Sequence, residues 1–502
     1  MDFISGSWED PARPDGVIEN RSPADLSLLL GRHPHAVAQV TRAVEAARAA
    51  AGPFAATPLE ARIALVRAIG AALKRHDEEL ARAIALDIGK PLWEARTEVA
   101  ACIAKAAITV EDGLALVRGF PAPGAQSAGP PSAECRFRPL GVLAVLGPFN
   151  FPVHLPNGHI LPALATGNAV VFKPSEVAPH AAEIYARCLG EAGVPPGVFN
   201  LVQGGPAEGQ ALAAHEGVDG VLFTGSFGVG CAIERANQGK SRLLALEMGG
   251  KNAAIVLADA NLDKALYDTA FSAFVSAGQR CTAASRVIVE GPPRRADEFA
   301  ARVAALARRM VIGHPLDEGT FAGPLASPAA LRKFEAGLEQ ARAQDGVETI
   351  LDSVRVIPRG LQGCYASPAV HRVRRRGDST YEREELFGPD LAVHHADSLE
   401  EACAIANATD YGLAASVHTA SAERFEQCLN LLQCGVVNHN APTVGASGRL
   451  PFGGLKRSGN HRPAGLFATL YCTAPVAVLR GESALDKSKL APGMSWPAMA
   501  GE

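Results

Sequence analysis

The sequence lacks the long apolar segments of membrane and secreted proteins. It contains no run of about 18 uninterrupted apolar residues, because Gly147, Pro148 and Pro152 break the apolar stretch that starts at Val142. The N-terminus carries acidic residues early and has no basic segment followed by an apolar one, which is the pattern of a secretory signal. We therefore expect no membrane partner and no secretory signal.

Paired cysteines and an excess of basic charge are missing as well. Ten cysteines are spread from Cys102 to Cys472 and none forms a C-x-x-C pair, so no disulfide framework and no metal site is predicted. No cluster of His, Cys and Asp has the spacing of a zinc site. Scattered thiols are typical of the reducing cytoplasm. The net charge of −4 argues against a nucleic-acid partner.

Length and composition predict a globular protein with more than one core. The chain has 502 residues, of which 48% are hydrophobic and 20% charged, and such a length exceeds one compact core. Apolar residues recur at helical spacing through residues 36–118, which predicts helices there. Residues 119–137 are dense in Gly, Pro and Ser, so they form either a loop or an extended excursion from the domain.

From Gly141 onward, short apolar runs alternate with helical stretches. Helices are predicted at His180–Glu191 and Ala207–His215. Alternating strands and helices indicate a doubly wound parallel sheet, which binds ligands at the carboxyl ends of its strands. A second cycle from Asn252 to about Asn438 predicts a second domain of the same α/β class. The runs with the pattern of buried strands in the first cycle are 142–147, 169–174, 198–204, 220–225 and 243–250.

Cys281 lies in a stretch of small polar residues just before a predicted strand. Gly278 permits close backbone approach, and main-chain N–H groups there are candidates for stabilising an oxyanion. A nucleophilic cysteine needs access and a lowered pKa, part of which Arg280 or a helix N-terminus would supply. The alternative is that Cys281, like most cysteines, is a small buried apolar residue.

Glu247 lies at the end of an apolar strand, where a carboxylate is costly to bury without a role. Gly249 and Gly250 follow, so the backbone can turn tightly beside it. A carboxylate in this setting has a raised pKa and suits a general base. The alternative is a carboxylate at the rim that pairs with a Lys or Arg.

Three turns after predicted strands carry polar residues that suit a ligand site. FTGSFGVG (223–230) would bring a phosphate to a helix N-terminus, although it is not the G-x-G-x-x-G pattern. VVFKPSE (170–176) supplies a lysine and a carboxylate for a ribose or phosphate. GPFNFP (147–152) supplies Asn150, an amide donor for an oxyanion. Each has the alternative of an ordinary turn with capping residues.

As an ordered set, these pieces resemble the aldehyde dehydrogenase superfamily over nearly the whole chain. The matching segments are GPFNFP, KPSE, FTGS, LEMGGKN, GQRC, EELFGP and PFGG. The resemblance implies that Cys281 attacks an aldehyde carbonyl and is left as a thioester. It implies that Asn150 and the Cys281 backbone N–H hold the oxyanion, and that Glu247 activates the water that hydrolyses the thioester.

The resemblance also implies NAD as the cofactor. Lys173 and Glu176 would contact the adenosine ribose, and the carboxylate of Glu176 would repel the 2′-phosphate of NADP. Glu385 would bind the nicotinamide ribose, with Phe387 beside the ring. The turn that would lie near the pyrophosphate contains Gly225, Ser226 and Gly230.

Segments 89–101, 147–176, 200–205 and 458–463 resemble the branch of the superfamily that oxidises succinylglutamate semialdehyde in bacterial arginine catabolism. The chain departs from that branch at Lys251, Ala253 and Ala283, which leaves the exact aldehyde open. A dicarboxylic substrate needs cationic partners, and a solvated surface role is the alternative for each candidate. The candidates are Arg280, Arg449, Arg457, His154 and His159.

The architecture implied by the resemblance has two domains and an arm. Residues 1–120 and 143–247 would form a discontinuous NAD-binding domain, and 248–440 the catalytic domain. Residues 121–142 and 463–482 would form an arm that adds strands to a partner's sheet, since strand edges recruit another chain. A homodimer or homotetramer is therefore expected. The polar, Pro- and Gly-containing tail 485–502 is predicted to be mobile.

Two alternatives to hydrolysis by water stay open on the sequence alone. The thioester would pass to coenzyme A in an acylating dehydrogenase, although an intact Glu247 favours water. A catalytically silent NAD-binding homologue would need no nucleophile, and the complete set of Asn150, Glu247 and Cys281 argues against it.

Overall fold

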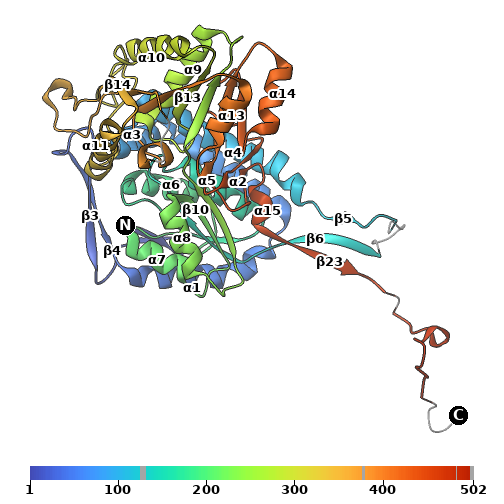
Figure 1. The fold of residues 1–502 in the computed structure, drawn as a ribbon. Coiled ribbons are helices and arrows are strands. Elements are labelled where there is room, and N and C mark those ends of the chain that lie inside the picture. The colour runs from blue at the N-terminus through green and yellow to red at the C-terminus, as the bar shows by residue number, and fades with distance from the viewer. Residues whose placement is uncertain (125–131, 376–378, 482, 498–502) are drawn as a thin grey trace.

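Two seven-stranded sheets organise the molecule (Figure 1). The computed structural model describes residues 1–124, 132–375, 379–481 and 483–497. Strands of the first sheet all precede residue 249, and strands of the second all follow residue 251. The α/β class predicted from the sequence is confirmed. Within the described residues no helix is long and apolar enough to cross a membrane.

The first sheet has the order β11-β10-β7-β8-β9-β1-β2. Its five parallel strands match the five predicted apolar runs, and the antiparallel pair at its edge was not predicted. Strands β7 and β8 are buried along their whole length, as expected for strands covered on both faces. The strands are β1 (Asp2–Ile4), β2 (Ser7–Glu9), β7 (Val142–Leu146), β8 (Ala169–Lys173), β9 (Phe199–Leu201), β10 (Gly220–Gly225) and β11 (Leu243–Met248).

The second sheet has the order β14-β15-β16-β13-β12-β18-β19. All its neighbours are parallel except the antiparallel edge strand β14. The second predicted cycle of strands and helices is thereby confirmed. The strands are β12 (Asn252–Val256), β13 (Ala284–Glu290), β14 (Val347–Leu351), β15 (Ala369–Val373), β16 (Asp390–Ala396), β18 (Ala414–His418) and β19 (Val436–His439).

Helices fill the connections between strands, as predicted for residues 36–118 and for the crossovers. Four long helices occupy that first stretch: α1 (Val37–Ala55), α2 (Leu59–Arg75), α3 (Asp77–Ile88) and α4 (Leu92–Ile108). A π-helical turn at Thr109–Gly113 continues α4. The helices that bear on the site are α5 (His154–Ala165), α6 (Pro179–Glu191), α7 (Pro206–Ala214), α8 (Phe227–Ala236) and α9 (Leu262–Phe274). The others are α10 (Pro293–Ala307), α11 (Pro328–Ala343), α12 (Thr380–Arg383), α13 (Leu399–Asn407), α14 (Ala422–Leu431) and α15 (Ala468–Tyr471).

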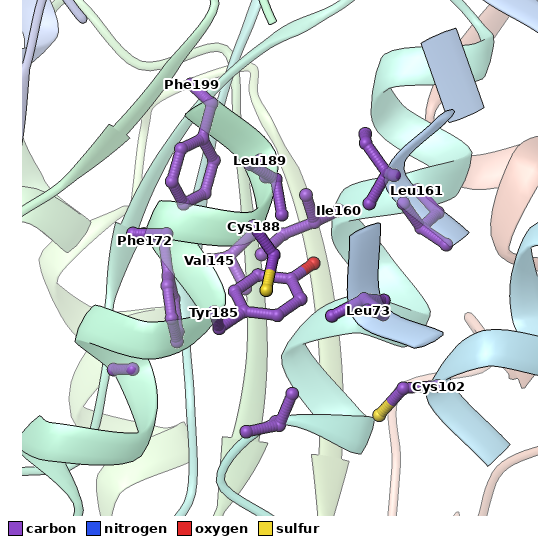
Figure 2. Packing of buried hydrophobic residues seen from close by; sticks show 14 of the residues in the cluster. Leu73, Cys102, Val145, Ile160, Leu161, Phe172, Tyr185, Cys188, Leu189 and Phe199 are labelled. Atoms are coloured by element: carbon purple, nitrogen blue, oxygen red, sulfur yellow. The ribbon is translucent and has the colours of Figure 1, made fainter. Parts of the chain in front are cut away.

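Tyr185 on α6 lies at the centre of the core between the first sheet and its helices (Figure 2). Its ring packs edge-on against Phe172 of β8 and Phe199, with ring centroids 6.2 and 6.3 Å apart. Its hydroxyl donates to Asn157 Oδ1 on α5 at 3.0 Å, so this buried polar group is satisfied. The core thus fixes α5, and with it the loop between β7 and α5.

An arm of extended strands leaves the body of the molecule (Figure 1). In it β6 (Ala133–Pro139) pairs antiparallel with β23 (Thr473–Leu479) on one side and with β5 (Phe120–Pro121) on the other. For the described part of residues 119–137, the extended excursion is therefore the correct alternative. Residues 125–131, 482 and 498–502 of the predicted arm and tail lie outside the described residues. The mobility of the tail and the domain boundaries stay predictions.

Three two-stranded antiparallel sheets complete the described fold. Strands β3 (Gly16–Arg21) and β4 (Leu29–His35) pair with each other in a separate antiparallel sheet. Strand β17 (Tyr411–Gly412) pairs with β21 (Leu455–Lys456), and β20 (Pro451–Phe452) pairs with β22 (Ala464–Gly465). An antiparallel bridge between Glu247 and Gly459 places the segment between β21 and β22 next to β11.

Candidate active site

Asn150 joins the loop after β7 to the loop that carries Cys281. Its side chain is buried, and its Nδ2 donates to the backbone oxygen of Gln279 at 3.0 Å. The two loops are far apart in the sequence, so this bond brings the predicted amide donor within two residues of the predicted nucleophile. The fold therefore gathers Asn150 and Cys281 as the motif series implies.

The loop before Cys281 has a strained backbone. Ser276, Ala277 and Gly278 have φ values of 57°, 51° and 71°, a left-handed region that side chains with a Cβ rarely adopt. A Cβ at Gly278 would collide with the carbonyl oxygen of Gly388, so only glycine fits there. Such strain persists where the surroundings impose it, and it is typical of functional sites.

The Cys281 thiol is free, half-buried and close to two carboxylates. Burial first, and then the negative charges of Glu385 and Glu247, raise its pKa to about 12, while Arg280 lowers it only in part. Arg280 acts in the expected direction, but the pKa as a whole is raised, because burial of the thiol outweighs this effect. The Arg280 guanidinium also donates to the buried Glu94 carboxylate at 2.8 Å.

Glu247 lies at the end of β11 with its carboxylate buried. Its Oε2 has no hydrogen-bond partner among the described residues, and burial raises its pKa well above the usual range. Residues of segment 458–463 hold this strand in place. The Met248 N–H donates to the Ser458 carbonyl at 2.9 Å, and the Leu246 N–H donates to Asn460 Oδ1 at 3.0 Å. This environment fits a general base rather than a rim carboxylate in an ion pair.

Glu385 and Phe387 bring a third segment to the site. The Gly250 N–H donates to Glu385 Oε1 at 3.1 Å, directly after β11, and burial raises the pKa of Glu385 to about 7. Phe387 has a left-handed φ of 56°. Its ring meets Phe149, the neighbour of Asn150, edge-on with centroids 5.7 Å apart. Glu385 and Phe387 line one small cavity together with Gly278 and Gly250.

Lys173 and Glu176 lie together at the carboxyl end of β8. The Lys173 ammonium is buried, donates to the Pro174 carbonyl at 2.6 Å and lies 3.8 Å from Glu176, whose side chain is 47% exposed. Burial lowers the pKa of Lys173. The pair therefore presents one fixed cation and one accessible carboxylate at the strand end.

The turn after β10 opens helix α8. Gly225 ends the strand, and Ser226 caps the helix by accepting from Val229 N–H at 3.4 Å. Gly230 has a packing function, because a Cβ there would collide with the Met248 sulfur on β11. The helix N-terminus thus lies beside the strand that carries Glu247.

The cationic candidates for substrate carboxylates are already compensated or neutral. Arg449 is exposed and pairs with Asp112 and Glu111, and Arg457 pairs with Asp410 at 2.9 Å. Burial lowers the pKa of His154 to about 4 and that of His159 to about 3, so both are neutral at pH 7. His159 Nδ1 is 2.7 Å from the Tyr471 hydroxyl. These residues, with Arg280, stay predictions.

Charged residues on and beside α4 are part of the site but were not predicted. Lys90 Nζ donates to Glu98 Oε2 at 2.5 Å, and Glu98 Oε1 accepts from the N–H groups of Val153 and His154 at 3.1 Å. The signal for them is in the sequence, because Glu94, Glu98 and Lys105 share the buried face of α4, which is otherwise apolar. Among the described residues, no cluster of three or more metal-ligating side chains is found.

Comparison with known proteins identifies the family. The profile of the Aldehyde dehydrogenase family matches residues 8–477. The chain belongs to the aldehyde dehydrogenase family. Its relatives include N-succinylglutamate 5-semialdehyde dehydrogenase of Escherichia coli, which is 41% identical over 499 residues and 98% of each chain.

Solved aldehyde dehydrogenases share the fold. Aldehyde dehydrogenase C of Pseudomonas syringae, a cysteine-to-alanine variant in complex with NAD+ and octanal, is 33% identical with a TM-score of 0.88, covering 95% of this chain and 96% of its own. Betaine aldehyde dehydrogenase of Staphylococcus aureus in complex with NAD+ is 28% identical with a TM-score of 0.89, covering 98% and 96%. The resemblance to the aldehyde dehydrogenase superfamily and the predicted fold class are confirmed.

Proposed function

We propose that this aldehyde dehydrogenase uses NAD+ to oxidise an acidic semialdehyde, N-succinyl-L-glutamate 5-semialdehyde, to N-succinyl-L-glutamate. The observation that supports it most is the gathering of Asn150, Glu247 and Cys281 in one site. The 41% identity to relatives named for that substrate supports the choice of aldehyde.

In this proposal Cys281 forms the covalent intermediate. Its thiol proton is released to solvent, and the sulfur bonds to the aldehyde carbon. Asn150 Nδ2 and the Cys281 backbone N–H donate to the oxygen that becomes negative. Bound NAD+ supplies the acceptor for the hydride that leaves this carbon. Cys281 is then a thioester.

Glu247 completes the cycle with water. Its unpaired, buried carboxylate takes a proton from a water molecule, which attacks the thioester carbon, and the acid leaves as the Cys281 sulfur regains a proton. A carboxylate without an ion pair favours hydrolysis over transfer to coenzyme A. Product analysis with and without coenzyme A distinguishes the two, and an acyl-coenzyme A product would contradict the role of Glu247.

The residues at the strand ends fit the parts of NAD. Glu176 offers an exposed carboxylate to the adenosine ribose diol beside the buried Lys173 ammonium, and the N-terminus of α8 at Ser226 suits the pyrophosphate. Glu385 and Phe387 line a cavity next to Cys281 and suit the nicotinamide ribose and ring. The carboxylate of Glu176 would disfavour NADP.

The arm supports a homodimer or homotetramer. Among the described residues strand β23 has one neighbour, β6, so its other edge is available for pairing with a partner, and Leu479 at its end is 83% exposed. All ten cysteines are free thiols, which suits the reducing cytoplasm proposed as the location.

One assay tests the substrate assignment. The specificity constants for succinylglutamate semialdehyde, succinate semialdehyde and a neutral aldehyde are compared by NADH absorbance. We expect succinylglutamate semialdehyde to give the highest value. A neutral aldehyde that matches or exceeds it would contradict the substrate, and no NADH with any aldehyde would contradict the activity.

A further inference from the structure

Charges of both signs are buried around His154, the first residue of α5. Two ion pairs balance four of them, Lys90 with Glu98 and Arg280 with Glu94. The electrostatic influence on the pKa of His154 comes from Glu98, Lys90, Lys105 and Arg280. Lys105 is therefore the cation of this group without a carboxylate.

Lys105 lies on the buried face of α4 with 5% of its surface exposed. Its Nζ donates to the Gly465 carbonyl at 2.7 Å, and within the described chain it forms no ion pair. Burial lowers its pKa to about 8, so it is mostly charged at pH 7. An ammonium has three N–H donors, and a buried charge is costly unless it is paired.

Two orphaned polar atoms lie close to Lys105. Thr109 follows it by one helical turn, and its buried Oγ1 has no hydrogen-bond partner in the described residues. The Nδ1 of His154 is likewise buried without a partner there. Lys105, Thr109 and His154 thus offer unused hydrogen-bonding groups around one uncompensated positive charge.

This charge lies between the two segments that carry the catalytic groups. On one side, His154 follows Asn150 in the loop after β7. On the other, Gly465 accepts from Lys105, and the backbone of the adjacent Ala464 faces the Glu247 carboxylate. A carboxylate held at Lys105 would therefore lie between the segments that carry Asn150 and Glu247. Arg449, by contrast, is exposed and paired with Asp112.

We propose that Lys105, assisted by Thr109 and His154, binds a carboxylate of the substrate and gives the enzyme its preference for acidic semialdehydes. This inference rests on the proposed function. Lys105 Nζ donates to the carboxylate, Thr109 Oγ1 donates a second hydrogen bond, and the carboxylate neutralises the buried ammonium.

The first test compares Lys105→Met with Lys74→Met, a substitution of an exposed lysine on α2. We expect the specificity constant for succinylglutamate semialdehyde, divided by that for pentanal, to fall about 10- to 100-fold in Lys105→Met and to be unchanged in Lys74→Met. Lys105→Arg should recover part of the ratio. An unchanged ratio in Lys105→Met would overturn the inference.

A second test measures binding without turnover. The product acid N-succinylglutamate should raise the Tm of the wild type and have little effect on Lys105→Met. The variant itself should be no less stable than the wild type without ligand, because it loses an uncompensated buried charge. An equal Tm shift in both proteins would overturn the role of Lys105. A wild type that binds the acid through Lys105 but prefers pentanal would contradict only the proposed substrate.

Discussion

The Glu94 carboxylate accepts a hydrogen bond of 2.8 Å from Arg280 Nη2, and this buried ion pair links α4 to the residue before Cys281. Ser276, at the start of the strained loop, also bonds to Glu94, and its Oγ accepts from Arg280 Nε at 2.8 Å. Helix α4 therefore anchors the nucleophile loop at both ends.

Glu94→Ala should lower the free energy of unfolding by about 3–5 kcal/mol, because it leaves Arg280 charged, largely buried and unpaired. Urea denaturation followed by circular dichroism measures the change. Asp263→Ala is the control, since Asp263 pairs with Arg302 at the surface, where an ion pair contributes little. Similar losses in the two variants would contradict the anchoring role of Glu94.

Gly278→Ala should abolish most activity and lower stability by several kcal/mol, because the new Cβ would meet Gly388 and the left-handed backbone would be strained. The control is Gly52→Ala in α1, where a Cβ meets nothing within 4 Å. This substitution should be neutral or slightly stabilising. The activity and the thermal unfolding of both variants are measured. An active Gly278→Ala enzyme would show that the contact between the loops is dispensable.

Buried strands were predictable where β-branched residues run without interruption, as in Val142–Leu146. Strands β15 and β16 were not predicted, because polar side chains break their apolar pattern. In the fold these side chains have partners from distant segments: His371 lies 3.3 Å from Asp390, and Arg372 lies 2.8 Å from Asp297. A sequence pattern shows the polar residues but not the pairing that lets them be buried.

The site was predictable as a set of motifs, but its electrostatics were not. Arg280 precedes the nucleophile and suggested a lowered thiol pKa. The carboxylate that neutralises it, Glu94, is 186 residues away in the sequence, so only the fold reveals the pair. The sequence likewise does not show that Lys105 is buried without a carboxylate partner among the described residues; only the fold reveals this.

Cys281→Ala should lose turnover by a factor of at least about 10³ while keeping its Kd for NAD nearly unchanged, because the substitution removes the nucleophile and little else. NADH absorbance and isothermal titration with NAD+ measure the two effects. Cys434→Ala, which replaces another half-buried free thiol, should keep its turnover. Residual activity of Cys281→Ala near the wild-type level would refute the assignment.

Glu385 should make stability fall as the pH rises. Its pKa is raised from 4.5 to about 7 in the folded protein, so its contribution is fully present below about pH 4.5 and is lost as the pH rises through 7. Relative to Glu385→Gln, the wild type should lose about 3 kcal/mol between about pH 4.5 and pH 8. Urea denaturation of both proteins across this range measures it. A difference that does not vary with pH would contradict the burial of this carboxyl group.

The most direct test of the mechanism mixes the Glu247→Gln variant rapidly with NAD+ and succinylglutamate semialdehyde and follows NADH formation over time. The variant should produce a burst of about one NADH per active subunit, followed by slow turnover, because the thioester forms but its hydrolysis lacks a base. Peptide mass spectrometry should find the succinylglutamyl group on Cys281. Steady turnover without a burst, or a burst without an adduct on Cys281, would contradict the proposed thioester mechanism.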